Sequence, residues 1–352
     1  MSDCFYRALE EKYRGSRELI KARQRVYLPF ITPLLKMYDN ACAIDVGCGR
    51  GEWLELLKEV GFEGNGVDLD DGMLAACRER GLTVQTGDAV HAIEALESDT
   101  QAVVSGFHVA EHVSFRQLQK LVQEALRVLK PAGLLILETP NPENIAVSTV
   151  RFYTDPTHLK PIPPSLLSFA PEFYGFCRTK VLRLQEPPTL FEGQAVTLHD
   201  VLTNVSPDFA VIAQKTAQKE SLELFDEPFN QEYGISLEAL AKRHVQQVED
   251  RSHEVESRFT SIQSRLDTAE AICLSAIAAA LRDVEDAGRR AAAAEARAGE
   301  LAERAADAEA AAAAAQTWLK AVHASTSWKV TAPLRLVTGF VRSRLGGSER
   351  HL

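Results

Sequence analysis

The sequence is poor in cysteine and has no closely spaced cysteine pair. Its six cysteines are scattered along the chain, at Cys4, Cys42, Cys48, Cys77, Cys177 and Cys273. The absence of any Cys-x-x-Cys pair argues against a zinc ribbon, and the irregular spacing argues against a disulfide scaffold. This cysteine usage is typical of a protein from a reducing compartment.

Long apolar runs and an excess of positive charge are also absent. No run reaches the roughly 20 apolar residues of a membrane-spanning helix. The charged start MSDCFYRALEEKYRGSRE predicts no secretory signal. The net charge of -10 argues against a general nucleic-acid binder. With 352 residues, 45% of them hydrophobic, we expect a cytoplasmic protein with one globular domain and an extended part.

Composition changes sharply near residue 235. No proline occurs from there until Pro333, and alanine dominates residues 289–315. Because alanine is the best helix former, we expect one long helix over 236–323, after a linker over 216–235. Apolar residues recur at mostly alternating spacings of three and four, at Val248, Val255, Phe259, Ile262, Leu266, Ala269 and Cys273. This pattern predicts a coiled coil and a homo-oligomer, although a solvated single helix is the alternative for the alanine-rich half.

The last segment, residues 324–352, is basic and amphipathic. From residue 317 to the end there are six Lys/Arg and one acid, hence +5, so the remaining residues carry -15. Four apolar residues fall on one helical face, with Leu336 and Phe340 beside it and Trp328 at its border: Val330, Leu334, Val337 and Val341. An interfacial helix on an anionic membrane has this composition, and a C-terminal packing segment is the alternative.

The strongest motif is ACAIDVGCGRGEWLELLKEVGF over residues 41–62. An apolar strand runs into Gly47, Gly49 and Gly51, and a helix follows. The glycines allow a tight turn and close approach of a ligand to the backbone, and the helix start offers unpaired N–H groups. The motif therefore predicts a nucleotide site.

Further predicted strands end in polar residues. The strand 64–67 ends in Asp68, about twenty residues after Gly47, where a carboxylate can bond to both ribose hydroxyls. The strand 82–85 leads to Asp88 and Ala89, and the strand 102–105 leads to Phe107 and His108. Ligands bind at this edge of open α/β sheets, so these residues are candidates for the same site.

Two ligands compete for such a loop. A nicotinamide dinucleotide requires a small residue at the position that Glu52 occupies, and an anion there disfavours pyrophosphate. Asp45, two residues before Gly47, suits a ligand with an ammonium and a sulfonium group. These charges favour S-adenosylmethionine.

Four motifs in order now resemble the class I S-adenosylmethionine-dependent methyltransferases: IDVGCGRG (44–51), GVDLD (66–70), GDA (87–89) and ALRVLKPAGLLILETP (125–140). The resemblance implies an α/β, Rossmann-like domain with a mostly parallel seven-stranded sheet over 41–215, followed by the coiled coil and the tail. A generic Rossmann-like domain of other chemistry is the alternative.

The resemblance also implies the roles of the donor-site residues. Asp45, Gly47 and Gly49 are expected near the methionine part, Asp68 at the ribose, and Asp88 with Ala89 at the adenine. Leu69, Met73 and Phe107 are expected to complete the pocket. Residues 1–40 are expected to form a helical lid whose basic residues include Arg25, a candidate partner of the donor carboxylate, and a solvated charged face is the alternative.

A chemical site is predicted after the fourth strand. His108, Glu111 and His112 would share one face of a helix start. His158 lies in a polar, proline-fixed loop that follows the fifth strand. The pattern resembles methyltransferases in which a Glu-x-x-Glu-His helix and a distant histidine bind a divalent metal, but His108 replaces the first glutamate, which favours a softer metal than magnesium. A metal site, a metal-free acid–base pair and a structural network all stay open.

A methyltransferase domain followed by a long coiled coil resembles the chain-terminating methyltransferases of O-antigen and other surface polysaccharides. The segment STSWKVTAPLRLV (325–337) is similar to a segment of glycan-assembly proteins. The resemblance implies methylation of a terminal sugar hydroxyl in lipopolysaccharide biosynthesis, with a glycosyltransferase partner or the inner membrane at the tail. Residues 185–235 are too few for a kinase. A quinone- or lipid-precursor O-methyltransferase is the rival function, and an inactive adaptor is a third.

Overall fold

The computed structural model describes residues 12, 15–191, 193–292, 298–328 and 330. The chain divides into two compact units, Met1–Glu254 and Val255–Leu352. Each unit is described by itself.

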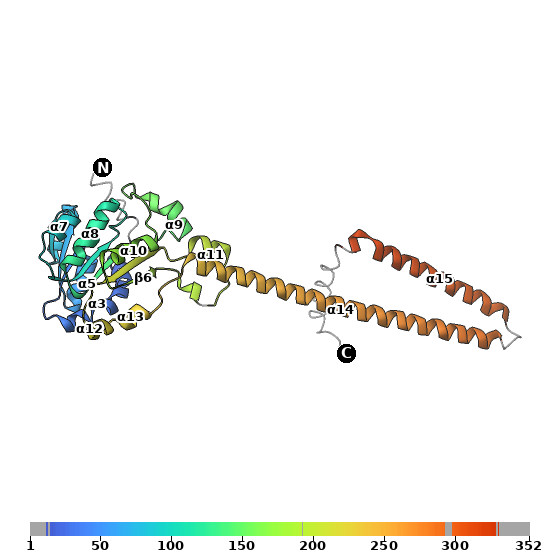
Figure 1. Ribbon diagram of the computed structural model, residues 1–352. Helices are drawn as coiled ribbons and strands as arrows, with labels where there is room; N and C mark the ends of the chain where they lie inside the picture. The colour runs from blue at the N-terminus through green and yellow to red at the C-terminus, as the bar shows by residue number, and fades with distance from the viewer. Residues whose placement is uncertain (1–11, 13–14, 192, 293–297, 329, 331–352) are drawn as a thin grey trace, which may run out of the picture. The chain divides into compact units, whose positions relative to one another are not determined.

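A seven-stranded sheet forms the centre of the first unit (Figure 1). Its strands are β1 Cys42–Val46, β2 Glu63–Asp68, β3 Thr83–Thr86, β4 Gln101–Phe107, β5 Leu129–Pro140, β6 Arg178–Leu184 and β7 Asp208–Gln214. The order is β3-β2-β1-β4-β5-β7-β6, with β7 antiparallel to both β5 and β6. This confirms the predicted α/β fold with a mostly parallel seven-stranded sheet.

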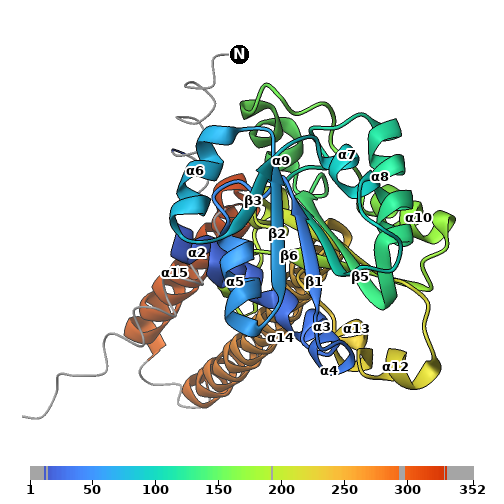
Figure 2. The same ribbon diagram turned by 90° about the vertical axis from the view of Figure 1, so that its left-hand side faces the viewer.

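Side chains alternate along the strands between the two faces of the sheet, and each face packs into a separate hydrophobic core. Val103, Leu134 and Ile212 point to one core, whereas the residue that follows each of them points to the other. The helices on the first face include α5 Glu52–Val60 and α6 Asp71–Glu79, and those on the second include α7 Ala89–Glu94, α8 Phe115–Val128 and α10 Pro164–Tyr174 (Figure 2). Since both faces are covered, the functional edge of the sheet is the one where its parallel strands end.

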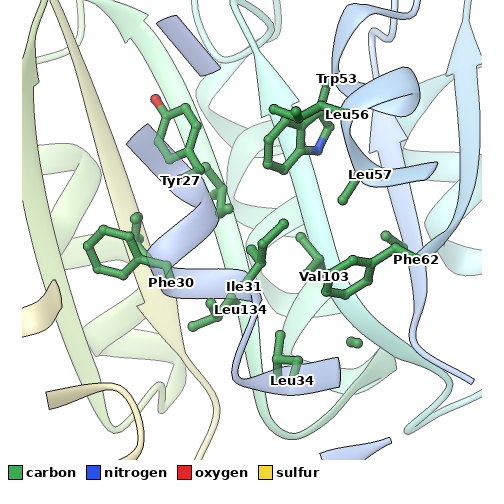
Figure 3. Packing of buried hydrophobic residues seen from close by; sticks show 14 of the residues in the cluster. Tyr27, Phe30, Ile31, Leu34, Trp53, Leu56, Leu57, Phe62, Val103 and Leu134 are labelled. Carbon is green, nitrogen blue, oxygen red and sulfur yellow. The ribbon is translucent and has the colours of Figure 1, made fainter. Parts of the chain in front are cut away.

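The described part of the expected N-terminal lid belongs to the domain core. It consists of α2 Arg17–Gln24, η1 Arg25–Tyr27, α3 Leu28–Ile31 and α4 Leu34–Met37. Tyr27, Phe30, Ile31 and Leu34 are fully buried and pack with Trp53 and other residues of the first core (Figure 3). A lid cannot move freely while these side chains are buried, so the prediction of a separate lid over 1–40 is wrong from Tyr27 onward.

The expected linker over 216–235 also packs on this domain. It contains α12 Lys219–Glu223 and α13 Asp226–Asn230. Phe225 is fully buried and Phe229 nearly so, both in the first core. Arg178 on β6 bonds to Asp226 at 2.7 Å and stacks over the ring of Phe229. The polar composition of the segment concealed these two anchoring aromatic residues, so the linker prediction is wrong.

Four short elements complete the domain, namely α9 Ile145–Thr149, η2 Arg151–Thr154, η3 Pro188–Phe191 and α11 Leu198–Thr203. The loop between η2 and α10 carries His158. A small separate cluster joins Leu190, Val201 and Leu240. Leu240 lies near the start of the long helix α14, Leu237–Ala292, so the first turns of α14 are fixed to the domain.

From Leu237 onward, the described part of 236–323 is helical, as α14 and α15, Ala298–Ala324, and residues 293–297 between them lie outside the description. In the single chain, Val255, Phe259 and Leu266 of the predicted seam are 67%, 59% and 37% exposed. The coiled coil itself stays a prediction.

Most of the predicted tail, residues 324–352, lies outside the description, which includes only 324–328 and Val330 of it. Among the described residues, none of the helices combines the length and the apolar character needed to cross a bilayer.

Candidate active site

A cavity of about 970 Å³ opens where β1, β2 and β4 end. Its wall is built from the glycine loop, the ends of β2 and β3, the turn after β4, the loop before α10, and α2. A volume of this size accommodates a nucleotide-sized ligand together with part of a second molecule. Most of the residues singled out from the sequence line this cavity: Gly47, Gly49, Asp68, Leu69, Met73, Asp88, Ala89, Phe107, His108, His112 and His158.

The glycine loop requires glycine at its first position. Gly47 has φ +66°, and a Cβ there would lie 2.4 Å from Cγ2 of Val109. The N–H of Gly49 donates to Oδ2 of Asp68 at 2.9 Å, and the N–H of Asp70 donates to Oδ1 of the same carboxylate at 2.9 Å. Asp68 therefore holds the loop and presents its remaining lone pairs to the cavity.

Asp88 has a similar double role. Its Oδ1 accepts from the N–H groups of Val90 and His91 at 2.9 and 3.0 Å and caps α7. The carboxylate also lines the cavity beside Ala89. Its position at the end of β3 is the one predicted for it.

One predicted contact of the donor site, Asp45, lies elsewhere. Asp45 is buried and accepts from Oγ of Ser105 at 2.7 Å, so it supports the end of β1 and is not among the cavity-lining residues. Glu52 is also buried and pairs with Arg50 at 2.8 Å and Arg17 at 3.4 Å. These arginines balance its charge, so the argument that Glu52 repels pyrophosphate is wrong.

Arg23 lines the cavity, whereas Arg25 was the arginine predicted to contact the donor. The Arg25 side chain is 56% exposed and lies 3.6 Å from Glu59, whereas Arg23 and Gln24 line the cavity. Gln24 is 7% exposed, and its Oε1 has no hydrogen-bond partner among the described residues. Side chains two residues apart on a helix point to different sides, so Arg23 and Arg25 cannot both face the cavity.

The segment 108–112 forms a turn, so the prediction of a helix start there is wrong. Helix α8 begins only at Phe115, after a capping box at Ser114. His108 has φ +56°, a left-handed conformation that is strained for a residue with a side chain. The turn still brings Nδ1 of His108 to 3.1 Å from Oε1 of Glu111. His108 and Glu111 are therefore in contact as predicted, although they do not lie on a helix.

Glu111 lies beneath the cavity wall and His108 lies in it. Glu111 is fully buried, and its Oε2 accepts from Oγ1 of Thr139 at 2.8 Å. Nε2 of His108 lies 3.5 Å from Oε1 of Glu138. Burial alone lowers the pKa of His108, but the carboxylates of Glu111 and Glu138 overcome that effect and hold the pKa well above its usual value. These two carboxylates therefore favour the charged imidazolium form of His108.

Sequence reasoning missed the acidic residues behind His108. Glu138 accepts from the hydroxyl of Tyr27, and Gln185 donates to its Oε1 at 3.4 Å. Asp208 lies close by because β7 runs antiparallel to β5, which places Asp208 opposite Pro140. Burial raises the pKa of Asp208 to about 6, with Glu138 adding to the shift and His108 opposing it.

A pair of histidines, His112 and His158, also lines the cavity. The rings of His112 and His158 lie 4.6 Å apart at 67°. Nδ1 of His112 contacts Oγ1 of Thr157 at 2.9 Å, and Nδ1 of His158 contacts the carbonyl oxygen of Phe152 at 2.6 Å. Burial lowers the pKa of His112, although the Glu111 carboxylate opposes the shift, so His112 is neutral at pH 7.

Comparison with known proteins identifies the family. A family profile described as a methyltransferase domain matches residues 19–167. The crystal structure of an S-adenosylmethionine-dependent methyltransferase from Archaeoglobus fulgidus is 33% identical, covers 60% of this chain and 100% of that chain, and has a TM-score of 0.53. The chain belongs to the S-adenosylmethionine-dependent methyltransferases.

Curated relatives match over shorter lengths. A probable S-adenosylmethionine-dependent methyltransferase of Mycolicibacterium smegmatis is 34% identical over 98 residues, which is 28% of this chain and 37% of the relative. A ubiquinone biosynthesis O-methyltransferase of Methylococcus capsulatus is 36% identical over 107 residues, which is 28% of this chain and 43% of the relative. The chain spans less than half the length of either relative.

The cavity fits the donor of this family. The Gly47 position leaves no room for a side chain, Asp68 offers a carboxylate for ribose hydroxyls, and Arg23 can pair with the donor carboxylate. The unpartnered Oε1 of Gln24 is an acceptor that the donor's ammonium can satisfy. Arg23 and Gln24 of α2 are therefore the residues that would hold the amino-acid end of the donor.

Two side-chain groups in the methyltransferase cavity can hold a metal ion. One consists of Glu111, His112 and His158, and the other of His108, Glu138 and Asp208, and in each group the ligand atoms lie within 4.8 Å of one another. The first group is the set predicted from the sequence without His108, which belongs to the second. Two imidazoles and one carboxylate suit a transition metal better than magnesium.

Proposed function

We propose that this methyltransferase transfers the methyl group of S-adenosylmethionine to a hydroxyl group. The observation that carries the proposal is the position of the His112 imidazole on the cavity wall, beside His158, where burial lowers the pKa of His112 and so favours its neutral form. The bound donor supplies an electrophilic methyl group. A hydroxyl acceptor must lose its proton as it attacks, and a neutral imidazole at the cavity can take it. A carboxylate or phosphate acceptor needs no such base.

We propose a sugar hydroxyl at the end of a surface polysaccharide as the acceptor, so that methylation caps the chain and limits its length. The long helix supports a spacer role. At about 1.5 Å per residue, the 56 residues of α14 extend roughly 80 Å. Such a spacer sets a distance between the capping site and the machinery that elongates the polysaccharide.

The proposed assembly follows from the surface of the same helix. An exposed row of Val255, Phe259 and Leu266 on a helix is costly in water unless a second helix covers it, so we propose a homo-oligomer. The basic tail would bind the cytoplasmic face of the inner membrane or a membrane-bound glycosyltransferase. The enzyme would then be cytoplasmic and peripheral.

A quinol or lipid precursor is the second candidate acceptor. The name of the relative from Methylococcus capsulatus, a ubiquinone biosynthesis O-methyltransferase, favours this alternative. A catechol hydroxyl needs the same removal of a proton. Under this alternative, α14 serves only to join subunits.

An acceptor panel tests both candidates. The purified full chain is incubated with methyl-labelled donor and methyl glycosides, O-antigen oligosaccharides, 3,4-dihydroxybenzoate or lipid extracts. Label on an oligosaccharide supports the polysaccharide function, and label on the catechol or a lipid replaces it with the alternative. Labelling that appears only on carboxylates would overturn the proposal of a hydroxyl acceptor.

A further inference from the structure

A short hydrogen-bonded chain leads from a carboxylate to His112. Thr157 Oγ1 donates to Oδ1 of Asp155 at 2.6 Å, and the same oxygen contacts Nδ1 of His112 at 2.9 Å. Oδ1 of Asp155 also accepts from the backbone N–H of Thr157 at 2.8 Å. The whole arrangement sits in the loop between η2 and α10, apart from His112 itself.

The number of hydrogens on Thr157 determines which group donates in each of these hydrogen bonds. A threonine hydroxyl has one hydrogen, and a carboxylate oxygen can only accept. The short contact with Asp155 therefore uses the single hydrogen of Thr157. The remaining contact of that oxygen is with Nδ1 of His112, so Nδ1 must carry a hydrogen and donate it. In a neutral imidazole the other nitrogen, Nε2, then holds a lone pair.

We propose, on the basis of the proposed transfer to a hydroxyl, that Asp155 and Thr157 are positioning residues that hold His112 in its Nδ1–H tautomer and present Nε2 to the acceptor. The acceptor O–H bond breaks as the Nε2–H bond forms, and the oxygen electron pair bonds to the methyl group. The leaving sulfur takes the electron pair of the old carbon–sulfur bond. The Nδ1–H stays in place throughout.

The neighbouring imidazole completes the arrangement. Nδ1 of His158 donates to the carbonyl oxygen of Phe152 at 2.6 Å, because a carbonyl can only accept. This bond fixes the ring that packs against His112 at 4.6 Å. Asp155 Oδ2 lies 3.8 Å from Nε2 of His158. When His112 takes a proton, Asp155 is thus the nearby charge that balances the new imidazolium, through Thr157.

The tautomer can be measured without any acceptor. The full chain is labelled with ¹⁵N-histidine, and long-range ¹H–¹⁵N correlations distinguish a protonated from an unprotonated ring nitrogen. The His112→Gln variant assigns the signals. We expect Nδ1–H in the unmutated chain and in Thr157→Ser, and a mixture of tautomers in Thr157→Val, which lacks the hydroxyl. In Asp155→Ala the freed hydroxyl can donate to Nδ1, so the Nε2–H form should gain population.

Two results of this measurement would overturn the proposal. One is an Nε2–H tautomer in the unmutated chain, and the other is an unchanged signal in both Thr157→Val and Asp155→Ala. A metal ion on Nε2 would also overturn the role as base, and it would show as a shift of the Nε2 signal when EDTA is added. If Thr157→Val fails to fold, Asp155→Ala and Thr157→Ser still decide the question.

Measurements of kcat and KM test whether Thr157 positions His112 or only stabilises the fold. With whichever of a methyl glycoside or 3,4-dihydroxybenzoate is methylated, we expect Thr157→Val to lower kcat about tenfold or more, and Thr157→Ser to restore most of it. KM for the donor should change less than about twofold in both. In the His112→Ala background, Thr157→Val should cause no further loss, because Thr157 acts through His112. A further tenfold loss there would refute this role.

Thr149→Val serves as the matched control. Thr149 is an exposed threonine of α9 whose hydroxyl bonds to the carbonyl oxygen of Ile145 at 2.6 Å, and it does not line the cavity. We expect no change in kcat for this variant. The measurements also distinguish the two proposals, since a confirmed tautomer without methylation of any hydroxyl would refute the proposed function alone.

Discussion

Replacing Asp68 by alanine should weaken binding of S-adenosylmethionine by roughly 10–100-fold. The carboxylate lies at the end of β2, half-buried, with the cavity in front of it. Both of its oxygens accept backbone N–H groups, from Gly49 and from Asp70, each at 2.9 Å. The substitution therefore removes a contact with the ribose and also releases the glycine loop from its support.

The magnitude follows from the strength of these bonds. A hydrogen bond to a charged group contributes about 1.5–3 kcal/mol, and every 1.4 kcal/mol corresponds to a tenfold change in affinity. Loss of the ribose contact alone thus corresponds to roughly 10–100-fold, and the loss of support for the glycine loop acts in the same direction. In Asp68→Asn the amide nitrogen cannot accept, so one backbone N–H loses its partner. We expect this variant to fall between wild type and Asp68→Ala.

Calorimetry with S-adenosylhomocysteine measures this affinity without turnover. The matched control is Asp99→Ala, which removes a surface carboxylate that pairs with Lys215 at 2.7 Å and does not line the cavity. We expect its affinity to stay at the wild-type value. A folded Asp68→Ala protein that binds as tightly as the wild type would refute the assignment of Asp68 to the ribose.

Three further predictions concern turnover, assembly and docking. His112→Ala should lower the methylation rate by about 10²–10⁴-fold while donor affinity stays nearly unchanged, because a general base acts in the transition state. Treatment of the unmutated protein with EDTA then separates metal-dependent from metal-free catalysis. Replacing Phe259, Ile262 and Leu266 together with Asp should give a monomer that still binds the donor, whereas light scattering that finds the unmutated protein monomeric would contradict the oligomer. Deleting residues 325–352 should abolish co-sedimentation with anionic liposomes at low salt and leave methylation of a short soluble acceptor unchanged, since each basic residue contributes about 1 kcal/mol near an anionic surface. If the full-length chain does not sediment with such liposomes, direct docking on lipid is wrong.

The sheet and the glycine loop could be predicted from the sequence because both are encoded locally. Residues along β4 and β5 are apolar at consecutive positions, as expected for strands covered on both faces. The positive φ of Gly47 and the lack of space beside it explain why the motif needs glycine there. Asp68 and Asp88 follow directly from the ends of their strands, so counting along the chain is enough to find them.

Two predictions near the cavity were wrong in detail. Arg25 was predicted to contact the donor, but Arg23, two residues earlier and on a different side of α2, lines the cavity. Helical spacing grouped His108 with Glu111, and they do meet, yet through a turn with φ +56° at His108. A period of 3.6 residues describes only a continuous helix, so it cannot be applied across a strand-to-helix connection or a helix end.

The polar groups around the histidines could not be found by any local pattern, because the contacts join distant positions. Tyr27 reaches Glu138 across 111 residues, and Thr157 reaches His112 across 45. Neither threonine nor tyrosine carries a motif that marks it as part of a site. Tyr27 is placed by the packing of η1 in the first core, and Thr157 by the loop before α10. The sequence thus identifies which groups can carry out the chemistry, whereas the direction in which each imidazole presents its lone pair depends on contacts that only the folded chain makes.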